Sequence, residues 1–381
     1  MTILNFWPFV PLKPVNHLAM DIFAGTGSSR IGNALYGYRR MNRIKVPVII
    51  TSKIEIDEYR NIPKGNKFVV SRDGNGKDRE KGEEMVSLRG HEIKSFIVDL
   101  LQEHDLKTIF GFCTGSGGTS SKLIPWLLPE LRIDGYVDNA TIFAIMPNIS
   151  DGHELLSNAM NFLEEMALLL DNKKIDSLVL IENGRVVNND SSDYSKTNLA
   201  IARCLEIIGR SLLPDSNGRV ALDPSDAKKL IFSKSSMLTM GYANLKMGRK
   251  HSDSLITGYI SDLTRRVITN NWAGAEIESN CKRAYFVLRA DPRYLSSNNL
   301  EIMAKVAKEL LHNASVTISD YAVPRSKIIE VAGIFVGIQT DIWSRYKQLV
   351  PDDQTQEAED NCSARIALGI DEKQEEAEHE T

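Results

Sequence analysis

Cysteine is scarce in this sequence, and its few copies are widely spaced. The 381 residues include four cysteines, with no CxxC pair, and seven scattered histidines. A disulfide framework or a zinc site needs such residues at short, regular spacings, so the pattern argues against both. We therefore expect a protein of the reducing cytoplasm.

Several common signatures are also missing. No run of 18 or more apolar residues occurs, so we expect no membrane-spanning helix. The apolar start of the chain is broken by Pro8, Pro11 and Pro14 and lacks the basic residues of a signal peptide. No P-loop string ending in GK[ST] exists, and Arg30 stands where a GxGxxG motif needs its last glycine. These absences argue against a P-loop NTPase and against a nicotinamide-dependent oxidoreductase.

The charge is unevenly distributed along the chain. Residues 351–381 carry 11 acidic and 2 basic side chains, a net charge of -9, whereas the other 350 residues carry 44 basic and 39 acidic side chains, a net charge of +5. A segment of this composition is typically solvated and disordered. Two interpretations stay open, a tail that only keeps the protein soluble and a tail that binds a partner.

The first half of the chain alternates strands with helices. Apolar runs predict strands at 17–24, 46–51, 108–112, 140–146 and 177–181. Helices are predicted at 30–40, 96–101 and 122–131. Strands that lead into glycine-rich turns and helices are typical of a parallel α/β sheet, whose ligands bind at the carboxyl ends of the strands.

The second half follows a different pattern. A long, largely buried helix is predicted over 194–213. Beyond it, the sequence predicts strands at 284–288, 315–318 and 328–338, with a helix at 298–311. We therefore expect an α/β domain, a long central helix and a smaller α+β domain.

Two glycine-rich loops follow predicted strands. Residues 24–32 read AGTGSSRIG, and residues 111–120 read GFCTGSGGTS. Glycines let the backbone approach a phosphate, and the N-terminus of the next helix adds free N–H donors. A tight strand-to-helix turn would also explain the first loop. The second loop is the stronger signal, because its run of small and hydroxyl residues is long and correctly placed.

Two further segments carry polar residues at suggestive spacings. Tyr194 and Asn198 are four residues apart, so they share one face of a helix, where a ring can stack on a base and an amide can read its edge. Residues 221–227, ALDPSDA, hold two aspartates, Asp223 and Asp226. Taken alone, both segments also fit ordinary helix starts.

These segments, in this order, resemble the tubulin and FtsZ superfamily. The second loop is similar to the tubulin signature GGGTGSG, with Phe112 and Cys113 in place of two glycines. The first loop is similar to the tubulin string AGQCGNQIG, with Thr26 in place of glutamine. Residues 73–79, DGNGKDR, resemble the third phosphate loop of the plasmid- and phage-borne tubulins TubZ and PhuZ. The resemblance covers about residues 17–345.

The resemblance implies a GTPase that binds GTP with Mg²⁺. It implies that the nucleotide is held by Gly25, Thr26, Gly27, Ser28, Gly74, Asn75, Gly76, Lys77, Gly111, Thr114, Gly115, Ser116, Gly117, Asn183, Tyr194 and Asn198. The loop at 221–227 is similar to the NxDxxD synergy loop of FtsZ, with Ala221 in place of asparagine. Asp223 and Asp226 are therefore the implied catalytic residues, and they act on the GTP of a neighbouring subunit. Hydrolysis then requires head-to-tail assembly into an open homopolymer.

The resemblance also divides the chain and suggests its role. It implies a GTP-binding domain at 1–193, a central helix and synergy loop at 194–226, a GTPase-activating domain at 227–350 and an acidic disordered tail at 351–381. We expect a filament that positions or segregates plasmid or phage DNA. The tail would bind a DNA-bound adaptor, a phage component or a neighbouring subunit, with the apolar string at 364–370 as its anchor. Alternatives are an FtsZ-like division-ring protein and a non-hydrolysing nucleotide-binding scaffold.

Overall fold

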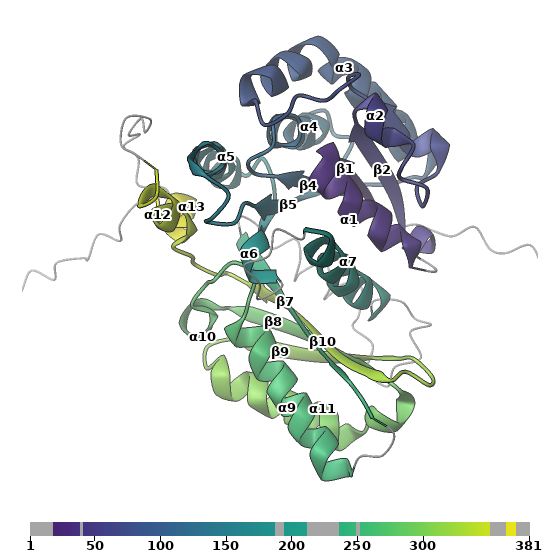
Figure 1. The fold of residues 1–381 in the computed structure, drawn as a ribbon, viewed down its shortest axis with the longest axis vertical. Coiled ribbons are helices and arrows are strands. Elements are labelled where there is room, and N and C mark those ends of the chain that lie inside the picture. The colour runs from purple at the N-terminus through teal and green to yellow at the C-terminus, as the bar shows by residue number, and fades with distance from the viewer. Residues whose placement is uncertain are drawn as a thin grey trace, which may run out of the picture.

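One twisted sheet of ten strands runs through the molecule, in the order β3-β2-β1-β4-β5-β6-β7-β10-β8-β9 (Figure 1). The computed structural model describes residues 18–38, 41–186, 194–211, 236–248, 252–350 and 363–370. Among these residues, no helix is both long and apolar enough to cross a membrane. The α/β class predicted from the sequence is confirmed.

The strands of the N-terminal half are all parallel. They are β1 (Ala19–Ala24), β2 (Lys45–Thr51), β3 (Lys67–Val69), β4 (Thr108–Thr114), β5 (Asn139–Met146) and β6 (Ser177–Glu182). Their sequences are almost continuously apolar because helices cover both faces of the sheet, which leaves no solvated face for polar residues. In β1, for example, all six residues are buried.

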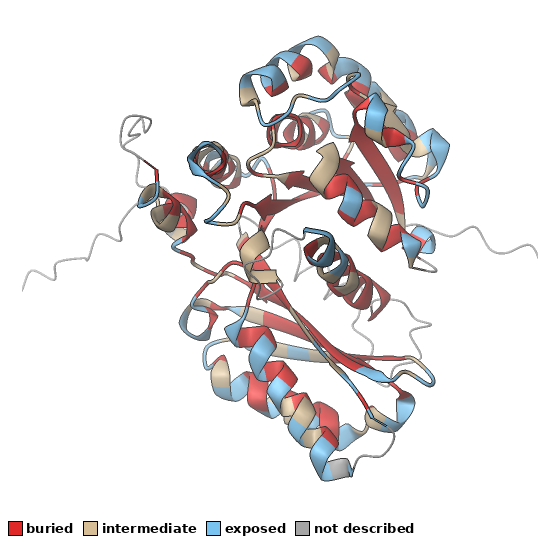
Figure 2. Cartoon of the chain, viewed as in Figure 1, coloured by how far each residue is buried: buried red, intermediate tan, exposed pale blue. Residues whose placement is uncertain are grey.

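Helices pack on both faces of this parallel sheet (Figure 2). One face carries α3 (Arg79–Glu103), α4 (Ser120–Ile133) and α5 (His153–Asp171), and the other carries α1 (Gly25–Gly37) and α7 (Tyr194–Ser211). Shorter helices are η1 (Met41–Arg43), α2 (Lys53–Ile56), η2 (Lys64–Asn66) and α6 (Asn183–Val186). On the α1 face, Phe112 stacks between Phe23 and Phe143, with ring centroids 4.4 and 4.5 Å apart. This stack explains why a phenylalanine can replace a signature glycine at position 112.

The C-terminal half adds a mixed sheet to the same ladder. Its strands are β7 (Ser236–Lys246), β8 (Arg283–Ala290), β9 (Ser315–Ala322) and β10 (Ile328–Val336). The helices are α9 (Asp253–Thr269), α10 (Ile277–Asn280), η3 (Pro292–Tyr294) and α11 (Ser297–Leu310). Strand β10 is antiparallel to β7 and β8, whereas β9 is parallel to β8. The join between the halves is the parallel pairing of β6 with β7, which matches residues 177–180 with 236–239.

The end of the chain returns to the N-terminal half. Helices α12 (Ile342–Lys347) and α13 (Ser363–Leu368) lie beside α5 (Figure 1). The Thr340 amide donates to the Ala367 carbonyl at 2.9 Å, and the Ser344 hydroxyl donates to the Gly369 carbonyl at 2.6 Å. The expectation of a disordered tail is therefore wrong for residues 363–370. The apolar string predicted as an anchor for another molecule packs on its own subunit.

Candidate functional site

A cleft of about 490 Å³ lies at the carboxyl ends of β1, β4, β5 and β6, where a parallel sheet binds its ligands. The loops that follow these strands supply most of its lining. The predicted nucleotide-contacting residues that line the cleft are Gly25, Thr26, Gly27, Gly74, Asn75, Gly76, Lys77, Thr114, Ser116, Gly117, Asn183, Tyr194 and Asn198. Folding thus brings together segments that are far apart in the sequence.

Three predicted contact residues do not line the cleft. The buried Ser28 hydroxyl of α1 donates to the carbonyl of Ala24, the residue just before that helix. Gly111 lies under α4, where an added Cβ would be 2.6 Å from Ile124. Gly115 leaves room for Met146, whose sulfur would be 2.8 Å from an added Cβ. These residues shape the loops from behind, and the predicted catalytic residues at 223 and 226 lie outside the described residues.

Two helix N-termini face the cleft. Helix α1 begins at Gly25 and α4 at Ser120, and both of these residues line the cleft. Ala24 has no side-chain acceptor, and within the described residues the Thr119 hydroxyl caps no amide of α4. Uncapped N–H groups at helix N-termini form a site for an anion such as phosphate.

The third predicted phosphate loop packs directly on the second. The Gly118 amide donates to the Gly76 carbonyl at 3.3 Å. A Cβ on Gly118 would lie 2.5 Å from the Asp78 carbonyl oxygen, so only glycine permits this approach of the two backbones. From α5, the Asn158 amide donates to the Lys77 carbonyl at 3.0 Å and holds the loop from outside.

An acidic side chain that the sequence did not single out enters the cleft from α2. The Thr26 hydroxyl contacts both carboxylate oxygens of Glu55, at 2.7 and 2.9 Å, and the Thr51 hydroxyl donates to one of them at 3.0 Å. Within the described part of the chain, no three His, Cys, Asp or Glu side chains group as metal ligands. A Mg²⁺ ion in this cleft would therefore take most of its ligands from phosphates and water, with Glu55 as the nearby carboxylate.

The opposite end of the cleft is suited to a base. Asn183 lines it, and its Oδ1 is buried without a hydrogen-bond partner among the described residues. The Tyr194 hydroxyl donates to Asp151 at 2.7 Å. Burial and the carboxylate of Asp151 raise the pKa of Tyr194 to about 12, so the phenol stays protonated at neutral pH. An unpaired buried acceptor in a cleft calls for a ligand that donates a hydrogen bond.

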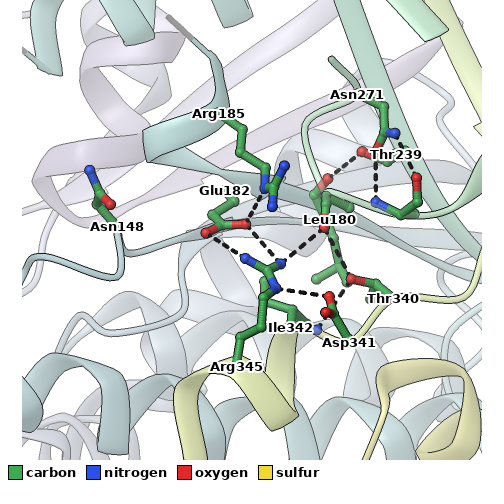
Figure 3. A network of polar contacts seen from close by, with 12 residues as sticks. Asn148, Leu180, Glu182, Arg185, Thr239, Asn271, Thr340, Asp341, Ile342 and Arg345 are labelled. Atoms are coloured by element: carbon green, nitrogen blue, oxygen red, sulfur yellow. Dashed lines mark hydrogen bonds and ion pairs between the residues drawn. The ribbon is translucent and has the colours of Figure 1, made fainter. Parts of the chain in front are cut away.

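The residue before Asn183 is held in a dense polar network (Figure 3). Glu182, which is 3% exposed, accepts two hydrogen bonds from Arg345, at 3.1 and 3.0 Å, and one from Arg185 at 2.9 Å. Arg345 also donates to Asp341 at 2.8 Å. This network joins β6 and α6 to α12, which lies more than 150 residues further along the chain.

The remaining lining residues were not predicted as contacts. They are Arg30, Thr51, Ser52, Glu55, Asp73, Gly118, Thr119, Ser120, Ile145, Pro147, Asp151 and Leu155. Gly118, Thr119 and Ser120 belong to the glycine-rich run that signalled the second loop, so the motif could have included them. Glu55 and Asp151 follow other strands with no recognisable motif, and only the fold places them here.

A parallel sheet with three glycine-rich loops at its carboxyl edge, a helix that brings Tyr194 to the cleft, and a mixed C-terminal continuation of the same sheet together match the tubulin and FtsZ fold. No model of a protein family matches the sequence. The chain is similar to the tubulin-like protein CetZ of Pyrococcus horikoshii, with 24% identity over 310 residues, which cover 76% of this chain and 78% of that protein.

Solved structures agree with this fold. CetZ1 from Haloferax volcanii, a GDP-bound monomer, superposes with a TM-score of 0.71 at 22% identity, covering 87% of this chain and 97% of that one. A GTPγS-form protofilament of TubZ from Bacillus thuringiensis serovar israelensis gives 0.68 at 13% identity, covering 88% and 92%. The tubulin and FtsZ superfamily is thus supported. The expected placement among plasmid- and phage-borne tubulins is not confirmed, because the CetZ proteins match this chain better.

Proposed function

We propose that this chain is a cytoskeletal GTPase that binds GTP and assembles into filaments. The observation that carries the proposal is the cleft itself, in which two uncapped helix N-termini lie at one end and the unpaired Oδ1 of Asn183 at the other. A nucleoside triphosphate has phosphates for the first end and a base for the second. Guanine offers N–H donors that match a free acceptor.

Each part of the cleft has a role in this proposal. Backbone N–H groups of the loops at 25–27, 74–77 and 114–117 surround the phosphates, where they replace water. Tyr194 stacks on the base, while Asn183 and Asn198 read its edge. Mg²⁺, when bound, neutralises charge on the transferred phosphate.

Assembly completes the catalytic site. The similar TubZ structure is a protofilament, which supports head-to-tail contact between copies of this chain. We propose that Asp223 and Asp226 of one subunit orient the water that attacks the GTP of the next, because phosphoryl transfer depends mainly on positioning. The comparisons lend no support to the expected DNA-bound adaptor or phage partner, and neither is part of the proposal.

Guanine specificity is the most direct test. We expect GTP to displace a fluorescent guanine nucleotide at concentrations at least tenfold below those needed for ATP, because a site built for specific hydrogen bonds rejects a base that leaves them unmade. Turnover per subunit should also rise with protein concentration above a threshold, and electron microscopy with GTP and Mg²⁺ should show filaments. Equal competition by ATP and GTP would exclude the proposed function.

The aspartates are tested by substitution. Asp223→Ala and Asp226→Ala should leave GTP affinity unchanged but lower turnover about tenfold or more, as loss of a water-orienting group does. Filaments of these variants should persist longer after GTP is added. Weakened GTP binding by dilute protein would show instead that the aspartates contact the nucleotide of their own subunit.

A further inference from the structure

Helix α12 contacts the base end of the cleft at two points. Its buried Tyr346 donates to the Pro147 carbonyl at 2.9 Å, and Pro147 lines the cleft. Its Arg345 binds Glu182, the residue directly before Asn183. Neither Arg345 nor Tyr346 is among the described residues that line the cleft, so both act on it from behind.

The Arg345 guanidinium is fixed in direction as well as in place. Two of its nitrogens bind the two oxygens of Glu182, at 3.1 and 3.0 Å, which is the bidentate geometry that only arginine provides (Figure 3). It also donates to Asp341 at 2.8 Å and to the Ala273 carbonyl at 3.3 Å. Such a clamp holds the plane of the Glu182 carboxylate and, through it, the end of β6.

Asn183 depends on this clamp because little else fixes it. Its Oδ1 has no partner within the described structure, so the orientation of the amide follows the backbone of residues 182–184. One residue further on, an added Cβ on Gly184 would lie 2.8 Å from the Asn148 side chain. The segment therefore contacts both Asn148 and the Arg345 clamp.

We propose that Arg345 is a positioning residue for base recognition, which holds Glu182 so that the Asn183 amide faces the 2-amino edge of guanine. This inference rests on the proposed function and deepens it. Without the clamp, the buried carboxylate of Glu182 keeps only the partly exposed Arg185 and turns toward water, and the backbone at Asn183 moves with it. Recognition of the base then weakens while the phosphate loops stay intact.

The test measures selectivity between GTP and ITP, because inosine lacks only the 2-amino group. In the full-length protein, both dissociation constants are measured by displacement of a fluorescent guanine nucleotide. We expect Arg345→Met to weaken GTP binding about tenfold and ITP binding much less, which is the loss that follows when a polar site leaves its partner group unpaired. Asn183→Ala should reduce the GTP preference to the same extent, and the double variant should lose no more, since residues that act as one unit are not additive.

Controls separate positioning from general stability. Arg266→Met removes an exposed arginine that pairs with Asp262 at 2.7 Å on α9, and it should leave the GTP preference unchanged. Arg345→Lys keeps the positive charge but cannot bind both carboxylate oxygens at once. Its preference for GTP over ITP should therefore fall between the wild-type and Arg345→Met values. If Arg345→Met fails to fold, the GTP and ITP dissociation constants of Arg345→Lys provide the test.

Several results would overturn the inference. Equal losses for GTP and ITP in Arg345→Met, an unchanged preference in Arg345→Lys, or a wild-type protein that binds GTP and ITP equally would each show that Arg345 has a purely structural role. Failure of the wild-type protein to prefer GTP over ATP would instead remove the proposed function. The two failures are therefore distinguishable.

Discussion

At the carboxyl ends of β1, β4, β5 and β6, polar groups face an open cleft, whereas around β7, β8 and β10 they are buried and paired with one another. In the cleft, the Oδ1 of Asn183 lacks a partner among the described residues. In the C-terminal half, Glu330 accepts two hydrogen bonds from Arg203 at 2.7 Å, one from Tyr242 at 2.7 Å and another from Arg289. Asn183 thus presents an unpaired acceptor at the cleft, whereas the carboxylate of Glu330 is paired with the residues around it.

The Glu330 cluster also shows how burial and charge compete. Burial raises the pKa of Glu330, but hydrogen bonds and charges from Arg203 and Arg289 outweigh it and hold the pKa below its ordinary value. Burial raises the pKa of the nearby Glu206, and the arginines offset this only in part. Because Arg203 and Glu206 belong to α7 and Glu330 to β10, the cluster fixes the central helix against the C-terminal sheet.

Breaking this cluster should give the largest loss of stability. Glu330→Gln leaves two mostly buried guanidinium groups facing a neutral amide, and breaking a buried ion pair in this way costs about 3 kcal/mol or more in the free energy of unfolding. Urea denaturation measures the loss. Glu309→Gln, at an exposed pair with Arg265 4.0 Å away, is the matched control and should change stability by about 0.5 kcal/mol or less. Similar values for the two variants would mean that the cluster does not hold the halves together.

Disrupting the cleft is expected to lower GTP affinity, whereas disrupting the Glu330 cluster lowers the free energy of unfolding. In Gly118→Ala the new methyl would lie 2.5 Å from the Asp78 carbonyl and force the phosphate loops apart. Overpacking of this kind costs about 1–3 kcal/mol in a folded protein. A similar loss of binding free energy would lower GTP affinity by about fivefold to 150-fold, and this is the range we expect. Gly258→Ala, on α9 with nothing within 4 Å of the new methyl, should leave affinity unchanged and stabilise the helix by about 0.5–1 kcal/mol. Unaltered GTP binding by Gly118→Ala would contradict the packing of the two loops.

Acid should lower the free energy of unfolding because it protonates Glu330 in the C-terminal half. The folded-state pKa of this group is lowered, so its contribution to stability is present above the unfolded pKa of about 4.3 and is lost as pH falls through the folded pKa. Unfolding free energies measured from neutral pH down to about pH 3.5 should therefore fall more steeply for the wild type than for Glu330→Gln. Parallel curves for the two proteins would assign the acid sensitivity to other carboxylates.

The smallest effect is expected at Tyr194. Tyr194→Phe keeps the ring for stacking and loses only the hydrogen bond to Asp151, at a residue that is 39% exposed. The net value of such a bond is about 1 kcal/mol or less, so GTP affinity should drop by about fivefold at most. Tyr194→Ala, which also removes the ring, should cost clearly more. A larger loss in the phenylalanine variant than in the alanine variant would be inconsistent with stacking.

The sequence predicts the parts of this fold whose pattern lies within one contiguous segment. The predicted strand at 17–24 corresponds to β1. The two glycine-rich loops predicted after β1 and β4 both line the cleft. Strand β7 escaped prediction because it is interrupted by Gly241 and by polar residues such as Asn244. Composition pointed to a disordered tail whose apolar string at 364–370 would bind another molecule, but residues 363–368 fold as α13 and pack on α5 of the same subunit.

Residues that reach a site through the fold cannot be found in this way. Glu55 comes from the short helix α2 and Asp151 from a loop, neither of which carries a motif, and Arg345 lies far along the chain from the Glu182 that it binds. Their roles depend on distances that only the packed structure sets. Conversely, Gly111 matches the family pattern and Ser28 lies within the first loop, but neither residue lines the cleft, because a motif records position in the chain and not the direction in which a residue faces.

The pairing of β6 with β7 has a consequence for how the molecule unfolds. Boundaries between independently folding units lie where few contacts cross, yet here a backbone ladder crosses from one half to the other. The Arg345 clamp on Glu182 crosses at the same place. Opening either half would leave hydrogen-bonding groups of the other without partners, so we expect the chain to unfold as one cooperative unit. A nucleotide bound at the edge of β6 should then raise the hydrogen-exchange protection of amides as distant as those in β8, through shared stability and without any change of shape.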